Sequence, residues 1–317
     1  MLSASGCAMR RRRLMQKLDS PAECAIVADP SHLMYLANWP IEPFSWSSAS
    51  PAILLVEADG RGTLVADNLA IRNPETIHVE KLEVVPWYNH SDSPGDRRLA
   101  VIERTLRLLC QAMPRSFAVE TRAVPAEIMR GLVRTCRETV LRSLDDALLE
   151  CREVKDADEL ELLARCMRDG EAGHARAWEA VRPGVTELDV YREVASACVA
   201  AAGMPVVVYG DFCSGPRTCT DRGGPATLRR LEAGDLMIMD FSVVIGGYRG
   251  DFTNTIAVGN RATAEQRRLV DLCLESMRCG ESACQPSESG GVVWHAMNRP
   301  LISANPAYRL PDRKSVV

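Results

Sequence analysis

The stretch MIMDFSVVIGGYRGDFTNTIAVG, residues 237–259, is typical of two β-strands joined by a glycine turn. Each predicted strand carries one aspartate, Asp240 or Asp251, among apolar and β-branched residues. Aspartate is depleted in strands, so two of them in one hairpin require a physical reason. A turn centred on Ile245 and Gly246 places the two aspartates directly opposite each other on one face, with Cβ atoms about 5 Å apart.

Two ionised carboxylates at about 5 Å repel each other by roughly 3 kcal/mol at an effective dielectric constant of about 20. A bound metal ion would offset this repulsion, because hard cations prefer oxygen ligands. A proton shared between the two carboxyl groups would also offset it, and so would the nearby Arg249. A slipped register with one aspartate facing solvent needs no site at all. The pairing by itself leaves these alternatives open.

The composition predicts an ordinary globular protein. The chain has 317 residues, of which 46% are hydrophobic and 25% charged, so it has room for two domains. Its net charge of −4 gives no reason to expect a nucleic-acid partner. The 12 cysteines show no zinc-like spacing, so we expect a reduced cytoplasmic protein with cysteines in its core. No stretch approaches the roughly 20 apolar residues of a membrane span, so we expect no membrane partner.

The first part of the chain is predicted to be a mixed α/β domain covering residues 1–150. The four arginines at 10–13 fit the solvated face of a first helix. Strand-like and helical patterns then alternate. The strands are expected at 23–30, 32–39 and 51–66, the last as a hairpin around Asp59 and Gly60, and the helices at 97–112 and 125–138.

Two helices are expected after this domain. Asp156, with Glu159 three residues later, has the spacing of a capping box at the start of the first helix. One face of that helix is predicted to be apolar, with Leu160, Leu163, Ala164, Met167, Ala177, Trp178 and Val181. His174 shares this spacing, and we expect it to pack at the edge of the core rather than to bind metal. Pro183 and Gly184 end the helix, and the second helix runs from a Thr186 cap to Ala201.

The quoted hairpin resembles the metal-binding hairpin of the family of creatinase, aminopeptidase P and methionine aminopeptidase, the pita-bread hydrolases. The family pattern has an aspartate, a Gly-Tyr pair before a second aspartate, then Thr-x-Thr and a glycine. This chain has Asp240, Gly247, Tyr248, Asp251, Thr253, Thr255 and Gly259 at these places. Four further segments resemble the catalytic domain of that family: REVKDADELELL (152–163), VRPGVTELDV (181–190), SGP (214–216) and LEAGDLMIMD (231–240). VADPSHLMYLANW (27–39) resembles its N-terminal domain.

The resemblance implies a creatinase-type mixed α/β N-terminal domain and a pita-bread catalytic domain, which is an α+β fold with pseudo-two-fold symmetry. In that family two divalent ions, often manganese, cobalt or zinc, are held by two aspartates, one histidine and two glutamates. They activate a water molecule that attacks an amide bond. Asp240 and Asp251 would be the two aspartates. The implied function is that of a metallohydrolase similar to Xaa-Pro aminopeptidase or creatinase, acting on a peptide or small amide, and we also expect a homodimer.

This chain departs from the family pattern between SGP and the first aspartate. The family usually has a Pro-His pair there, and this chain has Asp221 and Arg222. Arg222 stays protonated and cannot act as a general base. It could instead bind substrate by pairing with a carboxylate. Asn254 also lies between the two threonines, where arginine is common.

A second departure concerns the remaining metal ligands. The family histidine is expected in an H-G-x-G motif that is followed by both glutamates. After Asp251 the sequence has one histidine, His295, within the helical pattern VVWHAMNRPL, where we expect a structural role. The glutamates found before the expected place are Glu265, Glu275, Glu281 and Glu288. We therefore assign no catalytic residue in this chain and expect the chain itself to be inactive.

The last six residues, 312–317, can be encoded by GATCGGAAGAGCGTCGTG, which is a common sequencing-adapter sequence. We therefore expect a non-native tail, with the natural chain continuing past Pro311, although a genuine gene end could also translate this way. Residues 151–311 would then form an incomplete pita-bread domain. The alternative to a metallohydrolase is a non-catalytic binding protein on the same fold. An H-G-x-G motif and two later glutamates in a longer reading frame would distinguish the two.

Overall fold

The computed structural model describes residues 1–40, 52–87, 89–91, 95–135, 140–219, 223–308 and 310. The chain forms two compact units that are interleaved along the sequence. The first contains Met1–Ala175, Val194–Tyr209 and Phe241–Phe252, and the second contains Arg176–Glu193, Gly210–Asp240 and Thr253–Val317. The predicted division at residue 150 stays a prediction, and the predicted tail lies outside the described residues.

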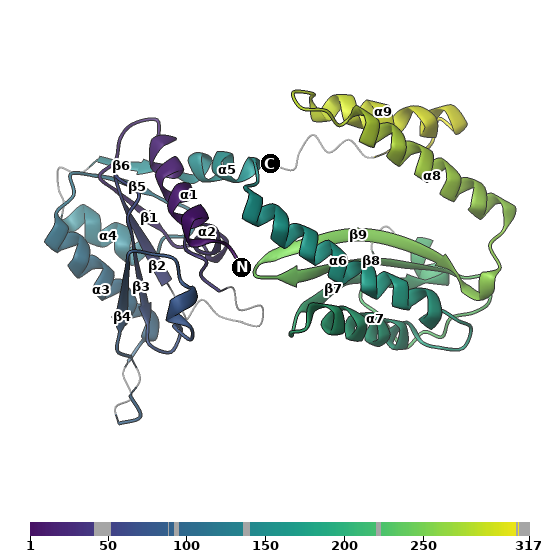
Figure 1. Ribbon diagram of the computed structural model, residues 1–317, viewed down its shortest axis with the longest axis horizontal. Coiled ribbons are helices and arrows are strands. Elements are labelled where there is room, and N and C mark those ends of the chain that lie inside the picture. Colours follow the sequence, from purple (N-terminus) through teal and green to yellow (C-terminus); the bar gives the residue numbers. More distant parts are fainter. Residues whose placement is uncertain are drawn as a thin grey trace. The chain divides into compact units, whose positions relative to one another are not determined.

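Six strands of the first unit form one mixed sheet in the order β4-β3-β2-β1-β5-β6 (Figure 1). They are β1 (Cys24–Val27), β2 (Ala52–Glu57), β3 (Gly62–Asp67), β4 (Lys81–Val85), β5 (Ser116–Val119) and β6 (Val140–Ser143). β2 is antiparallel to β1 and β3, whereas the β3–β4, β1–β5 and β5–β6 pairs are parallel. The predicted hairpin at Asp59 and Gly60 is confirmed, because the turn between β2 and β3 lies there and Gly60 has a φ of +88°. A 3-10 turn, Pro74–Thr76, precedes β4.

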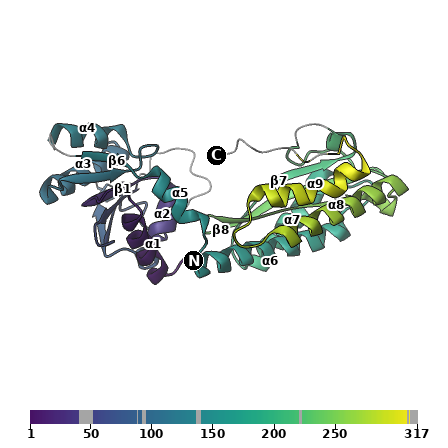
Figure 2. The same ribbon diagram turned by 90° about the horizontal axis from the view of Figure 1, so that it is seen from above.

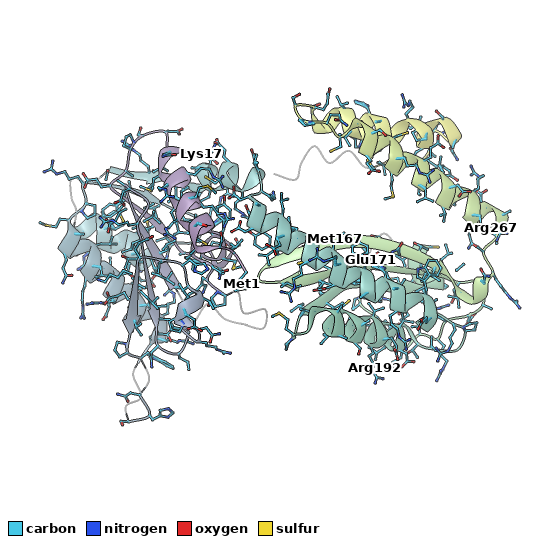
Figure 3. The ribbon with its side chains drawn as sticks, in the orientation of Figure 1. Met1, Lys17, Met167, Glu171, Arg192 and Arg267 are labelled. Carbon is cyan, nitrogen blue, oxygen red and sulfur yellow. The ribbon has the colours of Figure 1, made fainter. Side chains whose placement is uncertain are left out.

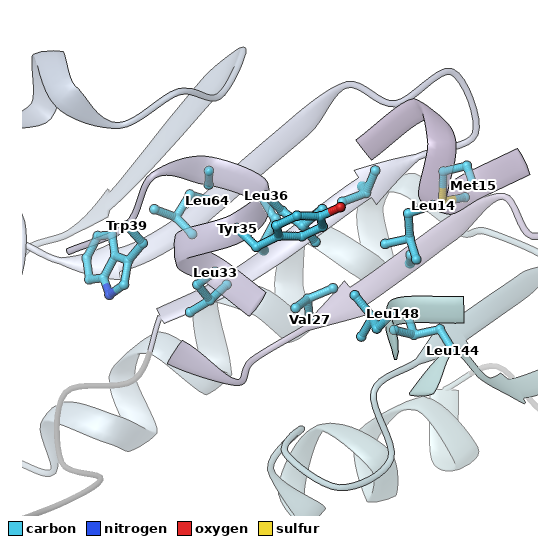
Figure 4. Close-up of a cluster of buried hydrophobic side chains, with 14 of the residues drawn as sticks. Leu14, Met15, Val27, Leu33, Tyr35, Leu36, Trp39, Leu64, Leu144 and Leu148 are labelled. Atoms are coloured by element: carbon cyan, nitrogen blue, oxygen red, sulfur yellow. The ribbon is translucent and has the colours of Figure 1, made fainter. Parts of the chain in front are cut away.

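Helices cover both faces of this sheet (Figure 2). One face carries α1 (Ala4–Gln16), α2 (Pro30–Ala37) and α5 (Asp145–Glu153), and the other carries α3 (Arg97–Ala112) and α4 (Ala126–Thr135). Alternate residues of a strand point to opposite faces, so β1 contributes Val27 to the first core (Figure 4) and Ile26 to the second. The predicted mixed α/β class of this domain is confirmed.

The predicted strand at 32–39 is wrong, because these residues belong largely to helix α2. Asp29 caps the helix by accepting a hydrogen bond from the Ser31 amide at 2.8 Å, and Pro30 occupies the first turn. Asn38 ends the helix in the left-handed conformation, with a φ of +54°. All residues from Leu33 to Ala37 are buried. The run is apolar throughout, so its sequence shows no helical period.

The arginines at 10–13 do not form a solvated face, as Arg10 and Arg11 are buried. The guanidinium of Arg11 donates to the carbonyl oxygens of Gly60, Leu36 and His78 at 2.9, 2.8 and 2.7 Å. It also donates to both carboxylate oxygens of Glu80 at 2.8 Å. These bonds satisfy a buried cation, so the side chain joins α1 to the sheet instead of facing water.

The remaining elements include a three-stranded sheet in the order β7-β8-β9. The elements are α6 (Ala157–Ala180), α7 (Glu187–Ala202), β7 (Val207–Ser214), a 3-10 turn (Gly215–Cys219), β8 (Leu236–Ile245), β9 (Tyr248–Ala257), a 3-10 turn (Val258–Asn260), α8 (Ala264–Ala283) and α9 (Gly290–Ala304). The predicted cap of α7 is confirmed, because Thr186 Oγ1 accepts a hydrogen bond from the Asp189 amide at 3.1 Å. In the part of the chain that the structure describes, no helix combines the length and apolar character needed to cross a membrane.

The predicted apolar face of α6 is largely wrong. Leu160, Met167 and Trp178 are exposed, and Met167 and Glu171 lie one turn apart on the helix (Figure 3). The buried side carries mostly smaller residues, namely Leu162, Cys166, Gly170, Gly173, His174 and Ala177. Small residues let the helix backbone approach the sheet closely, so side-chain size decided which face is buried.

Candidate metal centre

The β8–β9 hairpin turns at Gly246 and Gly247, one residue later than predicted. Both glycines have positive φ values, +55° and +80°, which is the requirement of a two-residue type I′ turn. The turn therefore places Ile245 opposite Tyr248. At the other end of the hairpin, the Val258 amide donates to the Asp235 carbonyl oxygen at 2.8 Å, which fits the same register.

This register changes the predicted pairing of the two aspartates. Asp251 lies opposite Ser242, and Asp240 lies opposite Thr253, so neither aspartate faces the other directly. A shift of two residues keeps a side chain on the same face of a strand, because the side-chain period is two. Asp240 is exposed between buried Met239 and Phe241, and Asp251 is exposed next to buried Gly250. Both carboxylates thus point to the exposed face of their strands.

Few partners surround these two carboxylates. Within the described part of the chain, the side-chain carboxylate of Asp240, which lies on strand β8, has no hydrogen-bond or ion-pair partner. Asp251 Oδ2 lies 3.8 Å from Nη2 of Arg249, and both side chains of this pair are more than half exposed. An exposed ion pair contributes about 0–1 kcal/mol, so Arg249 fixes Asp251 only weakly.

Helix α6 covers the opposite face of the hairpin. The imidazole of His174 packs against the rings of both Phe241 and Phe252, with ring centroids 4.4 and 4.3 Å away. Burial lowers the pKa of His174 to about 4, and a hydrogen bond with the backbone of Phe252 opposes this shift. The predicted packing role of His174 is confirmed.

A buried carboxylate that the sequence did not single out, Glu187, ties the end of β7 to later residues. Its Oε1 accepts hydrogen bonds from the amide and hydroxyl of Ser214 at 2.8 and 2.7 Å. Its Oε2 accepts from the amide and hydroxyl of Thr227 at 3.0 and 2.6 Å and from the Arg217 guanidinium. Burial by itself raises the pKa of Glu187, but the bonds from Thr227 and Ser214 outweigh it and hold the pKa below its usual value. No sequence pattern marks this glutamate as buried.

The other residues that the sequence pointed to are placed as follows. Asp221 and Arg222 lie outside the described residues. His295 is exposed on α9 and makes an edge contact with Trp294, with ring centroids 4.9 Å apart. Asn254 lies on β9, between the two threonines. The four glutamates that precede the expected ligand place are exposed on or after α8.

A second group of possible ligands lies in the N-terminal part of the chain, where no sequence pattern indicated a site. Asp29, His32 and Glu120 each offer a ligand atom, and these atoms lie within 4.8 Å of one another. Their hydrogen bonds are already made, however. Glu120 accepts from the amides of Ala28 and Asp29 at 2.7 and 2.8 Å and pairs with Nδ1 of His32. Nε2 of His32 lies 3.0 Å from Nη1 of Arg152, whose positive charge opposes a cation there.

Comparison with known proteins places these features in context. Residues 161–313 match the model of metallopeptidase family M24. The chain is 23% identical over 171 residues to the Xaa-Pro dipeptidase of Pyrococcus furiosus, covering 53% of this chain and 49% of the relative. It is 34% identical over 147 residues to the probable dipeptidase PepE of Mycobacterium tuberculosis, covering 44% and 39%. The chain therefore spans less than half the length of these curated relatives.

Solved structures resemble almost the whole chain. A Xaa-Pro dipeptidase from Bacillus anthracis matches with a TM-score of 0.73 and 16% identity, covering 96% of this chain and 78% of that one. Aminopeptidase P from E. coli matches with a TM-score of 0.73 and 20% identity, covering 96% and 73%. At such identities the likeness concerns the fold, and it confirms the predicted fold class, a mixed α/β fold of the creatinase and pita-bread type.

Proposed function

Because residues 161–313 belong to metallopeptidase family M24, we propose that this chain carries the aspartate part of a metal centre for amide-bond hydrolysis. The observation that carries the proposal is the placement of Asp240 and Asp251 on the exposed face of adjacent strands. Strands normally exclude aspartate, so its presence in both suggests a shared ligand.

The residues present fit a hard divalent ion. Asp240 and Asp251 supply carboxylate oxygens, which suit such ions, and the weak contact with Arg249 leaves Asp251 available. When bound, a metal would lower the pKa of a water molecule and polarise the substrate carbonyl. The chain itself holds the two carboxylates in place. On the opposite face of the hairpin, His174, Phe241 and Phe252 exclude water.

The finer features of the proposal follow the resembled family and the names of the relatives. We propose a centre of two ions, manganese, cobalt or zinc, and a peptide or small amide as substrate. The histidine and two glutamates that would complete the centre are assigned to no residue of this chain, so residues 1–317 alone are expected to be inactive. A homodimer in the cytoplasm completes the proposal.

Substrate recognition is proposed to involve Arg222, which would pair with a carboxylate of the substrate. Arginine in place of the family Pro-His pair also favours the alternative function, a non-catalytic binding protein that holds a similar ligand without cleaving it.

Manganese binding to residues 1–317 tests the proposal directly. Electron paramagnetic resonance of Mn²⁺ should show one weak site, and Asp240→Asn or Asp251→Asn should weaken it by about tenfold or more, because each removes an anionic ligand. Asp271→Asn, an exposed change on α8, is the matched control and should leave binding unchanged. Equal binding by all three variants would overturn the metal assignment, and tight binding of two ions would show that other ligands exist.

An activity assay separates the two candidate functions. A Xaa-Pro dipeptide that is hydrolysed with added Mn²⁺, and not in the presence of a chelator, supports a hydrolase. Binding of the same dipeptide without turnover, also in any longer reading frame that contains these residues, supports the binding protein.

A further inference from the structure

The stack of three rings beneath the hairpin connects α6 to both strands at once. His174 is 5% exposed, and its ring is nearly parallel to that of Phe241, with an interplanar angle of 22°. It is tilted by 36° against Phe252. The two phenylalanine centroids are 6.3 Å apart, so the three rings form one cluster in which the imidazole contacts both phenyl rings.

The two phenylalanines occupy corresponding positions in the hairpin, because Phe241 directly follows Asp240 and Phe252 directly follows Asp251. Neighbouring residues of a strand point to opposite faces. Each strand therefore presents an aspartate on one face and, one residue later, a phenylalanine to α6. A single side chain on α6 thus holds each strand next to its proposed metal ligand.

The backbone of α6 is adapted to this contact. A Cβ atom on Gly170 would lie 3.0 Å from Cε1 of Phe252, and one on Gly173 would lie 3.3 Å from Cζ of Phe241. On Gly173 it would also lie 2.5 Å from Sγ of Cys198. Glycine inside a helix costs about 1 kcal/mol relative to alanine. Two glycines on the face toward the hairpin therefore indicate that the close packing of α6 against the hairpin offsets this cost.

An aliphatic side chain would fill the same space, but histidine adds a polar link. The imidazole forms a hydrogen bond with the backbone of Phe252 and so fixes β9 along its length as well as against α6. Burial keeps the ring neutral at ordinary pH, because it lowers the pKa to about 4. A neutral ring avoids placing a second cation beneath a proposed cation site.

We propose that His174 is a positioning residue, which sets the spacing of Asp240 and Asp251 by clamping Phe241 and Phe252 from behind. The role rests on the proposed metal function of the two aspartates. The clamp itself, however, is a property of the hairpin and can be measured without any metal.

The test compares three variants of the full chain. His174→Ala removes the stack, His174→Phe keeps an aromatic ring but removes the hydrogen bond, and Leu162→Ala removes a buried side chain of α6 outside the stack. Hydrogen exchange of residues 239–253 reports the clamp, and Mn²⁺ resonance reports the carboxylates. Thermal unfolding of each variant measures the general loss of stability.

His174→Ala should speed exchange of the hairpin amides and weaken Mn²⁺ binding by about tenfold, since two ring contacts are lost. His174→Phe should restore most of the slow amide exchange and most of the Mn²⁺ affinity. Leu162→Ala should lower the unfolding temperature and leave the amide exchange and the Mn²⁺ affinity unchanged. The clamp is refuted if His174→Ala exchanges like the wild type, or if Leu162→Ala has the same effect on the hairpin. Absence of aspartate-dependent Mn²⁺ binding in the wild type would refute the metal function alone, and exchange would still decide the clamp.

Discussion

Nε of Arg10 lies 2.9 Å from Oδ2 of Asp156, and the arginine side chain is completely buried. The same guanidinium pairs with Asp158 and lies 3.8 Å from Glu159. Oε1 of Glu159 in turn accepts a hydrogen bond from the Tyr248 hydroxyl at 2.8 Å, at the start of β9. One ionic network therefore joins α1, the beginning of α6 and the hairpin that carries Asp251.

We predict that Arg10→Ala lowers the free energy of unfolding by about 3–5 kcal/mol, because Asp158 and the buried Glu159 lose their cation, whereas Asp156 keeps Arg13. Arg12→Ala, an exposed change in the same run of arginines, should stay within about 0.5 kcal/mol of the wild type. Urea unfolding followed by circular dichroism measures both. Equal effects of the two substitutions would mean that the network contributes nothing to stability.

Glu187→Gln should destabilise the protein by about 2–4 kcal/mol, because the amide cannot replace all the bonds of the carboxylate or the charge that faces Arg217. Glu193→Gln lies on the same helix and breaks an exposed pair with Arg176, so we expect a change of about 0.5 kcal/mol or less. Differential scanning fluorimetry of the two variants checks the difference. A Glu187→Gln protein as stable as its control would contradict the assigned role.

The lowered pKa of His174 predicts a pH dependence of stability. Its pKa is about 4 in the folded protein, against an ordinary value of 6.5, so folding disfavours the proton. The neutral His174 side chain therefore contributes fully to the stability of the fold above pH 6.5, and this contribution to the free energy of unfolding is lost as the pH falls toward 4. His174→Phe lacks the titrating group and should lose less stability over that interval.

Urea unfolding of wild type and His174→Phe at about pH 7 and about pH 5 measures the effect. His295→Gln is the control, because His295 is exposed on α9 and its replacement should keep the wild-type slope. If the free energy of unfolding changed equally with pH in wild type and His174→Phe, folding would not lower the pKa of His174.

Gly250→Ala should cost about 1–3 kcal/mol, since the space beside this residue is filled by helix backbone. Its Cβ would lie 2.9 Å from Sδ of Met167 and 3.0 Å from the carbonyl carbon of Cys166. A Cβ on Gly95 would meet nothing within 4 Å, so Gly95→Ala should be neutral or slightly stabilising. Thermal melting of both variants tests this, and a neutral Gly250→Ala would mean that α6 can move away from β9.

Local sequence patterns predicted much of the fold. The helix at 97–112 coincides with α3, because its apolar residues keep one helical period and Asp96 can cap it. The segment 32–39 was misjudged because an unbroken apolar run lacks a period that would separate helix from strand. The two aspartates of the hairpin stood out as soon as the strands were recognised, since strands rarely contain them.

The sequence by itself determined the mixed α/β class, the family resemblance and the choice of Asp240 and Asp251, because these depend on residue type and spacing along the chain. Only the tertiary structure decided that Arg10 and Glu187 are buried, that the hairpin turns at Gly246 and Gly247, and that α6 packs through its glycines and His174. The physical reason is that burial of a charge or of a small-residue face depends on partners distant in the sequence. Asp156 for Arg10, Ser214 for Glu187 and Phe241 for His174 are such partners, and they become visible only when the chain has folded.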